Sequence, residues 1–439
     1  MHTRIGIRRE DKNTWEARVP LTPEHASELT RKNNLQLVVQ PSKIRAFKDE
    51  EYQNAGIQVD EDLSSCETIV AVKEIPIDLL LAKKTYMFFS HTIKGQPYNM
   101  PLLKRLMELK CNLIDYERVV DEKNRRLIFF GRHAGLAGMI DSLHALGKRL
   151  EWEGIDTPFA KIQPAHQYTN LEAAKVAIRD VGKDIAKQGL ADSLCPFVIA
   201  VAGTGNVSLG VQEILDLLPH QDINPKELTT IFADNEPTNT CVFKMVLSEE
   251  DLVVPKSSDM TFDLQHYYDE PQHYEGHFQT YLPFITMLMN GIYWDEKYPR
   301  LITKDALRKL YQNQDTPRLR VIGDISCDPN GSIEFLEKIT HQEQPTFVYE
   351  PESQNVIDGV AGHGPVVLGV DNLPCELSYD ASQHFSSMLT PFVPALAQCD
   401  FSQPFAALNL PAPLKKGLIL HEGQLTPEYG YLEAHLAKP

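Results

Sequence analysis

Short apolar runs alternate with amphipathic stretches along the first part of the chain. Runs rich in β-branched and aromatic side chains predict strands at 35–39 (LQLVV), 68–72 (TIVAV), 85–89 (TYMFF) and 112–114. A helical pattern at 101–109 lies between the last two strands. Strands that alternate with helices are typical of βαβ units, so the pattern predicts an α/β fold with a parallel sheet.

The second part of the chain shows the same alternation with longer helices. Apolar residues spaced three and four apart form one stripe over 136–150, which predicts a helix from Gly135. Asn170 is expected to cap the next helix and Gly189 to end it. The acid-rich segment 248–275 is interpreted as a polar surface loop. Further strands are predicted at 127–131 (LIFFG), 242–247, 319–326, 346–350 and 366–374.

The apolar run FVIAVA (197–202) leads directly into a glycine-containing loop. Such a continuous run predicts a strand buried on both faces, and helical spacing resumes at Val211. In a strand–loop–helix unit of this kind, the first glycine allows a tight turn and the second lets the backbone approach a pyrophosphate. The helix N-terminus adds free N–H groups. The candidate cofactor-binding residues of this loop are Gly203, Thr204, Gly205, Asn206, Val207 and Ser208, with Ser208 in place of the usual third glycine.

The residue that contacts the adenosine ribose is expected about 20 positions after the first glycine, at the end of the second strand. QDIN (221–224) is the candidate strand, and it ends at Asn224, with Lys226 close behind. An acid there would repel a 2′-phosphate, whereas Asn224 and Lys226 would not, so this assignment favours NADPH over NADH. Asp234 is the alternative, and it would favour NADH.

Candidate acid–base residues follow two of the predicted strands. Lys73 comes directly after TIVAV, and His91 follows TYMFF. Ligands bind at the carboxyl ends of parallel strands, so both side chains are expected to face one crevice. A lysine whose pKa is lowered by burial and a histidine near neutrality suit proton transfer. Arg18 and Arg126 are candidates for binding substrate carboxylates, because guanidinium groups bind carboxylates in a bidentate manner.

Composition narrows the class of protein. The 439 residues are 42% hydrophobic and 23% charged, which is typical of a globular protein of two or three domains. The net charge of −17 argues against a nucleic-acid or anionic-membrane binder. Seven dispersed cysteines without a C-x-x-C pair predict no disulfide scaffold and no structural metal site. No apolar window of membrane-spanning length and no targeting segment is recognised, so a soluble, cytoplasmic protein is expected.

Several motifs resemble one enzyme family. They include RREDKNTWEARVPLTP (8–23), AVKEIP (71–76), YMFFSHTIKGQ (86–96), LIDYE (113–117), FGRHAGLAGMID (130–141), AGTGNVSLGVQEI (202–214), NGIYWDEKYPRLIT (290–303), GDISCDPNGSIEF (323–335) and DNLP (371–374). The chain resembles the lysine–2-oxoglutarate reductase half of the bifunctional aminoadipic semialdehyde synthases. It is more distantly similar to saccharopine dehydrogenases, alanine dehydrogenase and the nucleotide-binding part of transhydrogenase.

This resemblance implies two Rossmann-like, doubly wound domains with parallel sheets flanking a cleft. The expected substrate domain combines 1–135 with 368–439, and the expected NAD(P)-binding domain is 136–367. The resemblance assigns proton transfer to Lys73 and His91 and carboxylate binding to Arg18 and Arg126. It adds Glu117 and Asp324 as residues that shape the substrate site.

The implied activity is the reversible, NADPH-dependent condensation of L-lysine with 2-oxoglutarate to saccharopine, and NADH stays open as the cofactor. The implied partners are these small molecules, with no nucleic acid or membrane, and a homo-oligomer stays open. Two alternatives remain. One is a related dehydrogenase with another amine substrate, such as a lysine-forming saccharopine dehydrogenase or an alanine dehydrogenase-like enzyme. The other is a non-catalytic nucleotide-binding sensor.

Overall fold

The computed structural model describes residues 4–233, 238–314 and 317–436. The chain forms two compact units, Met1–Phe130 with Ser378–Pro439 (unit 1) and Gly131–Leu377 (unit 2). The expected divisions were at 135/136 and 367/368. The observed divisions differ because helix α4 (Gly131–Trp152) begins at Gly131, and the short helix η10 (Leu373–Leu377) packs against α4.

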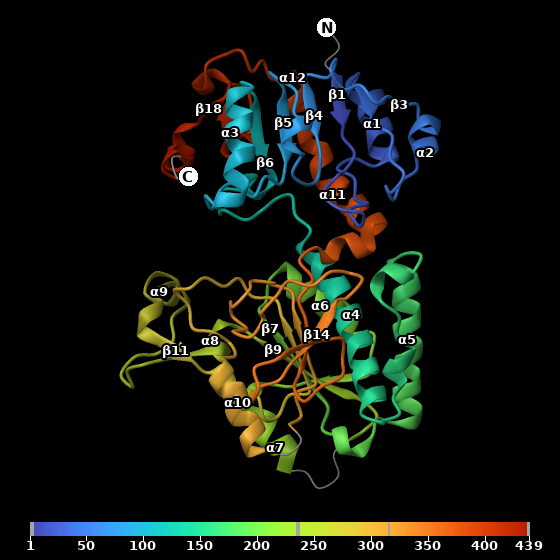
Figure 1. Cartoon of the computed structure of the whole chain (residues 1–439), viewed down its shortest axis with the longest axis vertical. Coiled ribbons are helices and arrows are strands. Elements are labelled where there is room, and N and C mark those ends of the chain that lie inside the picture. The colour runs from blue at the N-terminus through green and yellow to red at the C-terminus, as the bar shows by residue number, and fades with distance from the viewer. Residues whose placement is uncertain (1–3, 234–237, 315–316, 437–439) are drawn as a thin grey trace. The chain divides into compact units, whose positions relative to one another are not determined.

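Unit 1 is built on a mainly parallel sheet with strand order β18-β17-β6-β5-β4-β1-β2-β3 (Figure 1). Its parallel strands are β1 (Arg4–Ile7), β2 (Gln36–Val39), β3 (Gln58–Val59), β4 (Thr68–Val70), β5 (Thr85–Phe88) and β6 (Asn112–Asp115). Two strands from the end of the chain, β17 (Leu418–His421) and β18 (Gln424–Leu425), extend the β6 edge in the antiparallel sense. The strands predicted at 35–39, 68–72, 85–89 and 112–114 are therefore confirmed.

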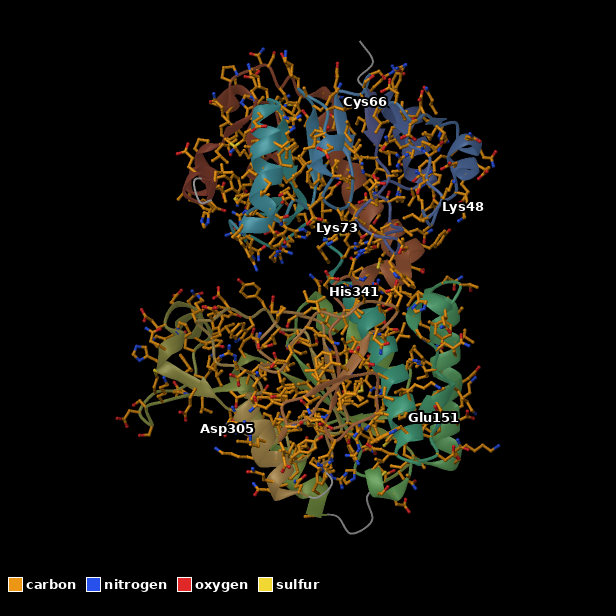
Figure 2. All side chains as sticks on the ribbon, viewed as in Figure 1. Lys48, Cys66, Lys73, Glu151, Asp305 and His341 are labelled. Carbon is orange, nitrogen blue, oxygen red and sulfur yellow. The ribbon has the colours of Figure 1, made fainter. Side chains whose placement is uncertain are left out.

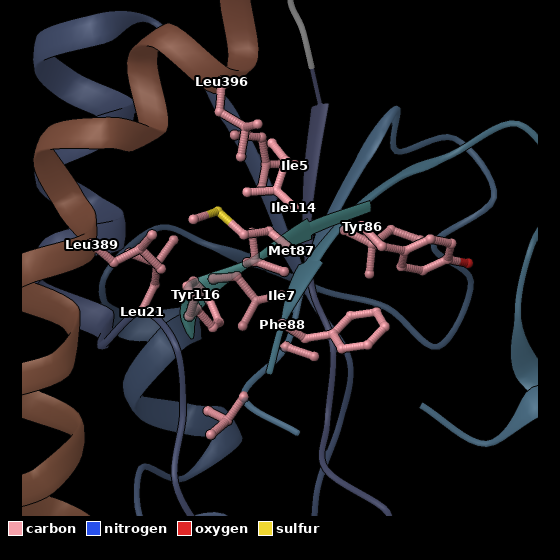
Figure 3. Close-up of a cluster of buried hydrophobic side chains, with 14 of the residues drawn as sticks. Ile5, Ile7, Leu21, Tyr86, Met87, Phe88, Ile114, Tyr116, Leu389 and Leu396 are labelled. Carbon is pink, nitrogen blue, oxygen red and sulfur yellow. The ribbon is translucent and has the colours of Figure 1, made fainter. Parts of the chain in front are cut away.

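Helices cover the sheet of unit 1 and close one continuous core. They are α1 (Pro23–Asn33), α2 (Asp49–Asn54), α3 (Met100–Glu108), α11 (Ser378–Leu389), α12 (Val393–Gln398), α13 (Ala412–Gly417) and α14 (Glu433–Leu436). Figure 3 shows Ile7 and Met87 of the strands facing Leu389 of α11 and Leu396 of α12. The C-terminal helices therefore belong to the core of a sheet built mostly from the first 115 residues.

Unit 2 contains a second mainly parallel sheet, with strand order β15-β14-β16-β13-β12-β7-β9-β8. Its strands are β7 (Val198–Ala202), β8 (His220–Asp222), β9 (Val242–Leu247), β12 (Met287–Asn290), β13 (Val321–Asp324), β14 (Thr346–Tyr349), β15 (Val356–Asp358) and β16 (Val366–Leu368). Within the described residues, antiparallel pairing in this sheet is limited to β14, which pairs in that sense with β15 and β16. The expected class, two α/β units with doubly wound parallel sheets, is confirmed.

Both faces of this sheet are buried. Ile199 and Val201 of β7 belong to one core with α4, α5 (Leu171–Gln188) and α6 (Asn206–Leu215), whereas Ala200 of β7 belongs to the core on the other face. That second core includes residues of α10 (Lys304–Asn313) and α7 (Leu228–Ala233). Helix α5 has the predicted ends, since the Asn170 side chain accepts from the Ala173 N–H and Gly189 follows the last turn.

Two predictions about local structure were wrong. No strand forms at 127–131, where Ile128 and Phe130 instead pack into the core as irregular chain. The segment 248–275 is not a bare loop. It holds α8 (Glu249–Leu252), β10 (Val253–Pro255), α9 (Leu264–Asp269) and β11 (Tyr274–Gly276), and β10 pairs with β11. Buried Val253, Tyr267 and Tyr274 anchor the segment on the core, because their apolar surface outweighs the acidic residues around them.

Candidate functional site

The glycine loop of unit 2 forms an open cradle after β7. Gly203 has φ +99°, a conformation that favours glycine, and its N–H donates to the Leu247 carbonyl of β9 at 2.9 Å. Gly205 is the N-cap of α6 and provides no side-chain cap, so the first N–H groups of this ten-residue helix lack intrahelical partners. A Cβ added at Gly205 would meet no heavy atom within 4 Å. The cradle therefore fits the pyrophosphate of a dinucleotide.

The remaining loop residues divide between surface and packing. Thr204 and Asn206 are exposed beside Gly205, whereas Val207 is half-buried and Ser208 is fully buried. The Ser208 hydroxyl accepts from the Gln212 side chain at 3.0 Å. Ser208 therefore stabilises the helix that carries the cradle, as expected for a small residue at the third fingerprint position.

Helix α6 lies unusually close to α4. A Cβ on Gly210 would fall 2.0 Å from the Arg132 carbonyl oxygen, and a Cβ on Gly135 would fall 2.0 Å from the Val207 carbonyl oxygen. Both contacts are with backbone, which cannot give way as a flexible side chain would. Glycine at these two positions therefore allows helix α6, which carries the cradle, to pack closely against α4.

The structure does not place Asn224 where the strand pattern predicted it. Strand β8 ends at Asp222 and lies at the sheet edge, while β9 is the strand beside β7. Asn224 caps a short turn, where its Oδ1 accepts from the Lys226 N–H at 3.0 Å. The roles of Asn224 and Lys226 in ribose binding stay predictions, but the strand end that suggested these roles is not at Asn224. Asp234, the alternative, lies outside the described residues.

Strand β9 ends at Leu247, so Ser248 and Glu249 follow the strand that neighbours the cradle. Glu249 is half-buried and accepts from the Tyr268 hydroxyl at 2.9 Å. Sequence reasoning missed Glu249 because the distance rule of about 20 residues assumes that the next strand in sequence is also next in space. The apolar run 242–247, followed at once by Ser248 and acids, is the signal that could have identified it.

In unit 1, Lys73 and His91 follow the neighbouring parallel strands β4 and β5, as predicted (Figure 2 labels Lys73). His91 Nδ1 bonds to Glu74 Oε1 at 2.5 Å, and Lys12 Nζ lies 3.3 Å from Glu74 Oε2. Burial would raise the pKa of Glu74, but its hydrogen bond and charge interaction with His91 outweigh burial and hold that pKa at about 2. Glu74 is therefore an ionised carboxylate that orients the His91 ring.

The half-buried Lys73 amine lies near other charges. Desolvation and the charges of Arg18 and Lys12 together lower the pKa of Lys73 to about 8, against the opposing carboxylates of Glu74 and Glu16. Near neutral pH an appreciable fraction of this amine is therefore uncharged. A lysine in that condition exchanges protons readily.

A buried carboxylic acid fixes the backbone that carries Lys73. The N–H groups of Val72 and Lys73 donate to the two Glu10 carboxyl oxygens at 2.6 and 2.9 Å. Burial and the nearby Glu16 raise the pKa of Glu10 to about 8. Sequence reasoning missed Glu10, although it lies in the acid- and arginine-rich motif at the chain start.

The predicted substrate-binding arginines differ in their surroundings. Arg18 is buried, donates to both Glu16 oxygens at 2.7 and 2.6 Å, and lies 4.2 Å from the centre of the Phe130 ring. Arg126 is half-exposed and contacts Glu117 at 3.2 Å. Glu117 follows β6 on the same sheet edge as Lys73 and His91. Unit 1 thus carries Arg18, Lys73, His91, Glu117 and Arg126.

Asp324 lies in unit 2 with the cradle. It ends β13, is fully buried, and accepts from Asn290 Nδ2 at 2.9 Å and from Ser326 Oγ at 2.6 Å. Burial raises the pKa of Asp324 to about 6, against these hydrogen bonds. Its second oxygen, Oδ2, has no hydrogen-bond partner among the described residues. Strand β13 lies two strands from β7 and runs parallel to it. Asp324, at the end of β13, therefore lies on the carboxyl edge of the sheet that also carries the cradle.

A buried carboxyl pair lies elsewhere in unit 2. Asp141 of α4 and Glu376 of η10 hydrogen-bond to each other, and His166 Nδ1 lies 3.2 Å from Glu376 Oε2. Asp141 Oδ1 also accepts from the Ala165 N–H at 2.7 Å. Burial raises the pKa of Glu376 to about 7, and burial together with the charge of Glu376 raises the pKa of Asp141 well above its usual range. The pair shares a proton at neutral pH.

These features are typical of a dinucleotide-binding α/β protein, whose other unit carries Lys73 and His91 after neighbouring strands. Comparison with known proteins gives the family. Residues 6–137 match the N-terminal domain, and residues 294–428 the C-terminal domain, of alanine dehydrogenase/PNT. The chain belongs to this family. The expected enzyme class, a nicotinamide-dependent oxidoreductase, agrees with that membership.

Individual relatives refine the comparison. Alpha-aminoadipic semialdehyde synthase of Arabidopsis thaliana is 37% identical over 98% of this chain, which spans 41% of that relative. Saccharopine dehydrogenase [NAD(+), L-lysine-forming] of Neurospora crassa is 26% identical over 89% of this chain and 90% of its own length. A solved L-alanine dehydrogenase structure shares the fold, with TM-score 0.63, 20% identity and coverage of 99% and 100% of the two chains. In the described part of the chain, no helix is long and apolar enough to cross a membrane.

Proposed function

We propose that this chain catalyses the reversible condensation of L-lysine with 2-oxoglutarate and reduction of the product to saccharopine. The observation that carries the proposal is Lys73, a half-buried amine with a pKa of about 8 next to the Glu74–His91 pair. The similarity to alpha-aminoadipic semialdehyde synthase over 98% of the chain supports this choice of substrates. Because the chain spans less than half of that relative, the proposal is limited to the reductase reaction.

Residues of unit 1 carry out the proton transfers of the proposed reaction. The amine of the substrate must be neutral to attack the ketone, and water loss requires a proton at the carbinolamine oxygen. His91 is held through Nδ1 by Glu74, which leaves Nε2 as the ring nitrogen for proton exchange. Lys73 polarises the carbonyl oxygen in its charged form and takes up a proton in its neutral form. The ionised Glu74 stabilises the imidazolium that forms.

Carboxylate binding falls to the arginines. Arg126 is half-exposed and contacts Glu117 through one nitrogen of its guanidinium, so the rest of that group is available to a substrate carboxylate. Arg18 is already paired with Glu16, and a substrate carboxylate would compete with Glu16 for it. We therefore propose Arg126 as the main carboxylate-binding residue and Arg18 as a residue that tunes the pKa of Lys73.

The cradle from Gly203 to Ser208 would hold the pyrophosphate of the nicotinamide cofactor. When bound, that cofactor supplies the hydride that reduces the imine carbon. NADPH is the cofactor expected from the sequence. The position of Glu249 after the strand beside β7 supports NADH as a second candidate, because a carboxylate there accepts from ribose hydroxyls and repels a 2′-phosphate.

Steady-state kinetics test the proposal. Oxidation of NADPH and NADH is measured with 2-oxoglutarate and L-lysine, L-ornithine or L-alanine as the amine. We expect the highest kcat/KM with L-lysine, and a loss of about 10²-fold or more in Lys73→Met and His91→Gln with unchanged cofactor affinity. Lys84→Met, at the start of β5, is the matched control. Preference for another amine would indicate a related dehydrogenase, and cofactor binding without turnover would indicate a sensor.

Cytoplasmic localisation and a homo-oligomeric state also stay predictions. Fractionation of cells and light scattering of the purified protein test them separately from the reaction.

A further inference from the structure

Unit 2 contains a pocket on the opposite edge of its sheet from the cradle. Thr286, Arg320 and Leu194 line it, and they precede β12, β13 and β7, respectively. The cradle follows the other end of β7, and five strand residues span about 16 Å. The volume of the pocket, about 830 Å³, lies in the range of sites for small organic ligands.

Arginines dominate the charge of this pocket. Arg149 and Arg320 share one carboxylate, that of Glu153, with contacts of 2.6 and 2.9 Å. Arg318 donates to the carbonyl oxygens of residues 194, 195 and 196 at 3.1 to 3.4 Å, and it forms no ion pair with any described residue. Among the described residues that line the pocket, three guanidinium groups therefore face one carboxylate, in a chain whose net charge is −17.

Thr286 and two aromatic rings complete the lining. Thr286 is 1% exposed, and its hydroxyl has no hydrogen-bond partner among the described residues. The hydroxyl oxygen has almost no accessible surface, so it lies behind the lining and does not face an occupant of the pocket. The ring of Trp152 is half-exposed with Arg149 at 4.7 Å, and Tyr311 contributes a second ring. Flat aromatic walls favour a planar ligand body.

We propose that this pocket binds a small planar organic anion that carries two or more negative charges. Its carboxylate or phosphoryl oxygens pair with Arg318 and Arg320, and its apolar body lies against Trp152 and Tyr311. Bidentate guanidinium pairing suits both oxyanion types. This site is independent of the proposed reaction, because the residues that define it precede the strands or lie at the far end of α4.

Calorimetric titration with benzene-1,3,5-tricarboxylate, phenyl phosphate and benzoate tests the proposal. We expect at least one of the two multiply charged probes to bind at least tenfold more tightly than benzoate. Arg320→Gln and Arg318→Gln should each weaken the tighter probe by about tenfold or more. Arg179→Gln, an arginine on α5 outside the pocket, is the matched control and should leave the dissociation constant unchanged. Saturating NADP⁺ should not displace the probe.

Trp152 fluorescence provides a second readout in the wild-type protein. We expect the bound probe to quench this emission, and Trp152→Phe to remove the quenching. Equal affinity in wild type and both arginine variants, displacement by NADP⁺, or no binding of either multiply charged probe would each overturn the proposal. If the arginine variants do not fold, the wild-type protein decides the question. A probe that binds to wild type without changing Trp152 emission then overturns the proposal as well.

Discussion

Replacing Glu376 by glutamine should change how the stability of unit 2 depends on pH. In the folded chain the buried carboxyl of Glu376 has a pKa of about 7, against an ordinary value of 4.5. The folded state therefore keeps a proton that the unfolded state releases above pH 4.5. The stability from this group is fully present below pH 4.5 and is lost as the pH rises through 7. The amide of the Glu376→Gln variant does not titrate, so the loss disappears in the variant.

The size of the effect follows from the difference between the two pKa values. A difference of 2.5, at about 1.36 kcal/mol for each pH unit, corresponds to about 3 kcal/mol between pH 4.5 and pH 8. For a unit of this length, 3 kcal/mol corresponds to about 6 to 12 °C in melting temperature. Glu10, Asp115 and Asp324 also have raised pKa values, so wild type retains part of its pH dependence from them. The difference between wild type and variant reports on the Asp141–Glu376 pair, because the substitution also removes the charge that raises the pKa of Asp141.

Thermal and urea unfolding, followed by circular dichroism at pH 5, 6, 7 and 8, measures this difference. The free energy of unfolding of wild type should fall by about 2.5 kcal/mol more between pH 5 and pH 8 than that of Glu376→Gln. Asp184→Asn, at a partly exposed partner of Lys161, is the control and should follow wild type. Parallel pH curves for wild type and Glu376→Gln would refute the reasoning, because they would show that Glu376 ionises normally in the folded chain.

The remaining predictions concern the cradle. Gly205→Val should raise the dissociation constants of NADPH and NADH by about tenfold or more with an unchanged melting temperature, since the added side chain enters open space; unaltered binding in titration would contradict the cradle assignment. Gly210→Ala should destabilise the chain by about 1–3 kcal/mol, because its Cβ meets the Arg132 carbonyl; an unchanged urea midpoint would argue against this contact. Glu249→Gln should shift the kcat/KM ratio of NADPH to NADH towards NADPH by about tenfold, since charges about 4 Å apart interact by roughly 1–4 kcal/mol. Asn224→Asp should leave that ratio unmoved, and a shift there would restore the assignment made from the sequence.

Local patterns predicted the parallel sheets well, because buried strands of this fold are continuous apolar runs. FVIAVA and its glycine loop are recognisable for that reason, and so are the strand ends that carry Lys73 and His91. The order of the strands in the sheet depends on long-range contacts, so no local sequence pattern predicts it. The ribose assignment failed at this point, since β8 precedes β9 in sequence but lies outside it in the sheet.

The charged partners of the candidate site residues also could not be predicted from the sequence. Glu10, Glu16 and Glu74 resemble ordinary surface acids in the sequence, and only folding places them against Lys73, Arg18 and His91. Their burial then sets the pKa values on which the proposed chemistry depends. The prediction of a strand at 127–131 was wrong for a different reason. Ile128 and Phe130 are buried, as their composition predicts, but backbone pairing stops after the single bond from the Leu127 N–H to the Val119 carbonyl, so no strand forms among these described residues.

The edge pairing between β17 and β6 has a consequence for the order in which the protein is made. Leu418 and Leu420 pair with residues 114 and 113, about 300 positions earlier in the chain. During synthesis on the ribosome, the β6 edge of the unit 1 sheet stays uncovered until residues 418–425 have emerged, whereas unit 2 is complete once Leu377 is available. Unit 2 is thus the first part that can finish folding during translation. A ribosome stalled before residue 418 holds a nascent chain whose unit 1 keeps an open, aggregation-prone strand edge.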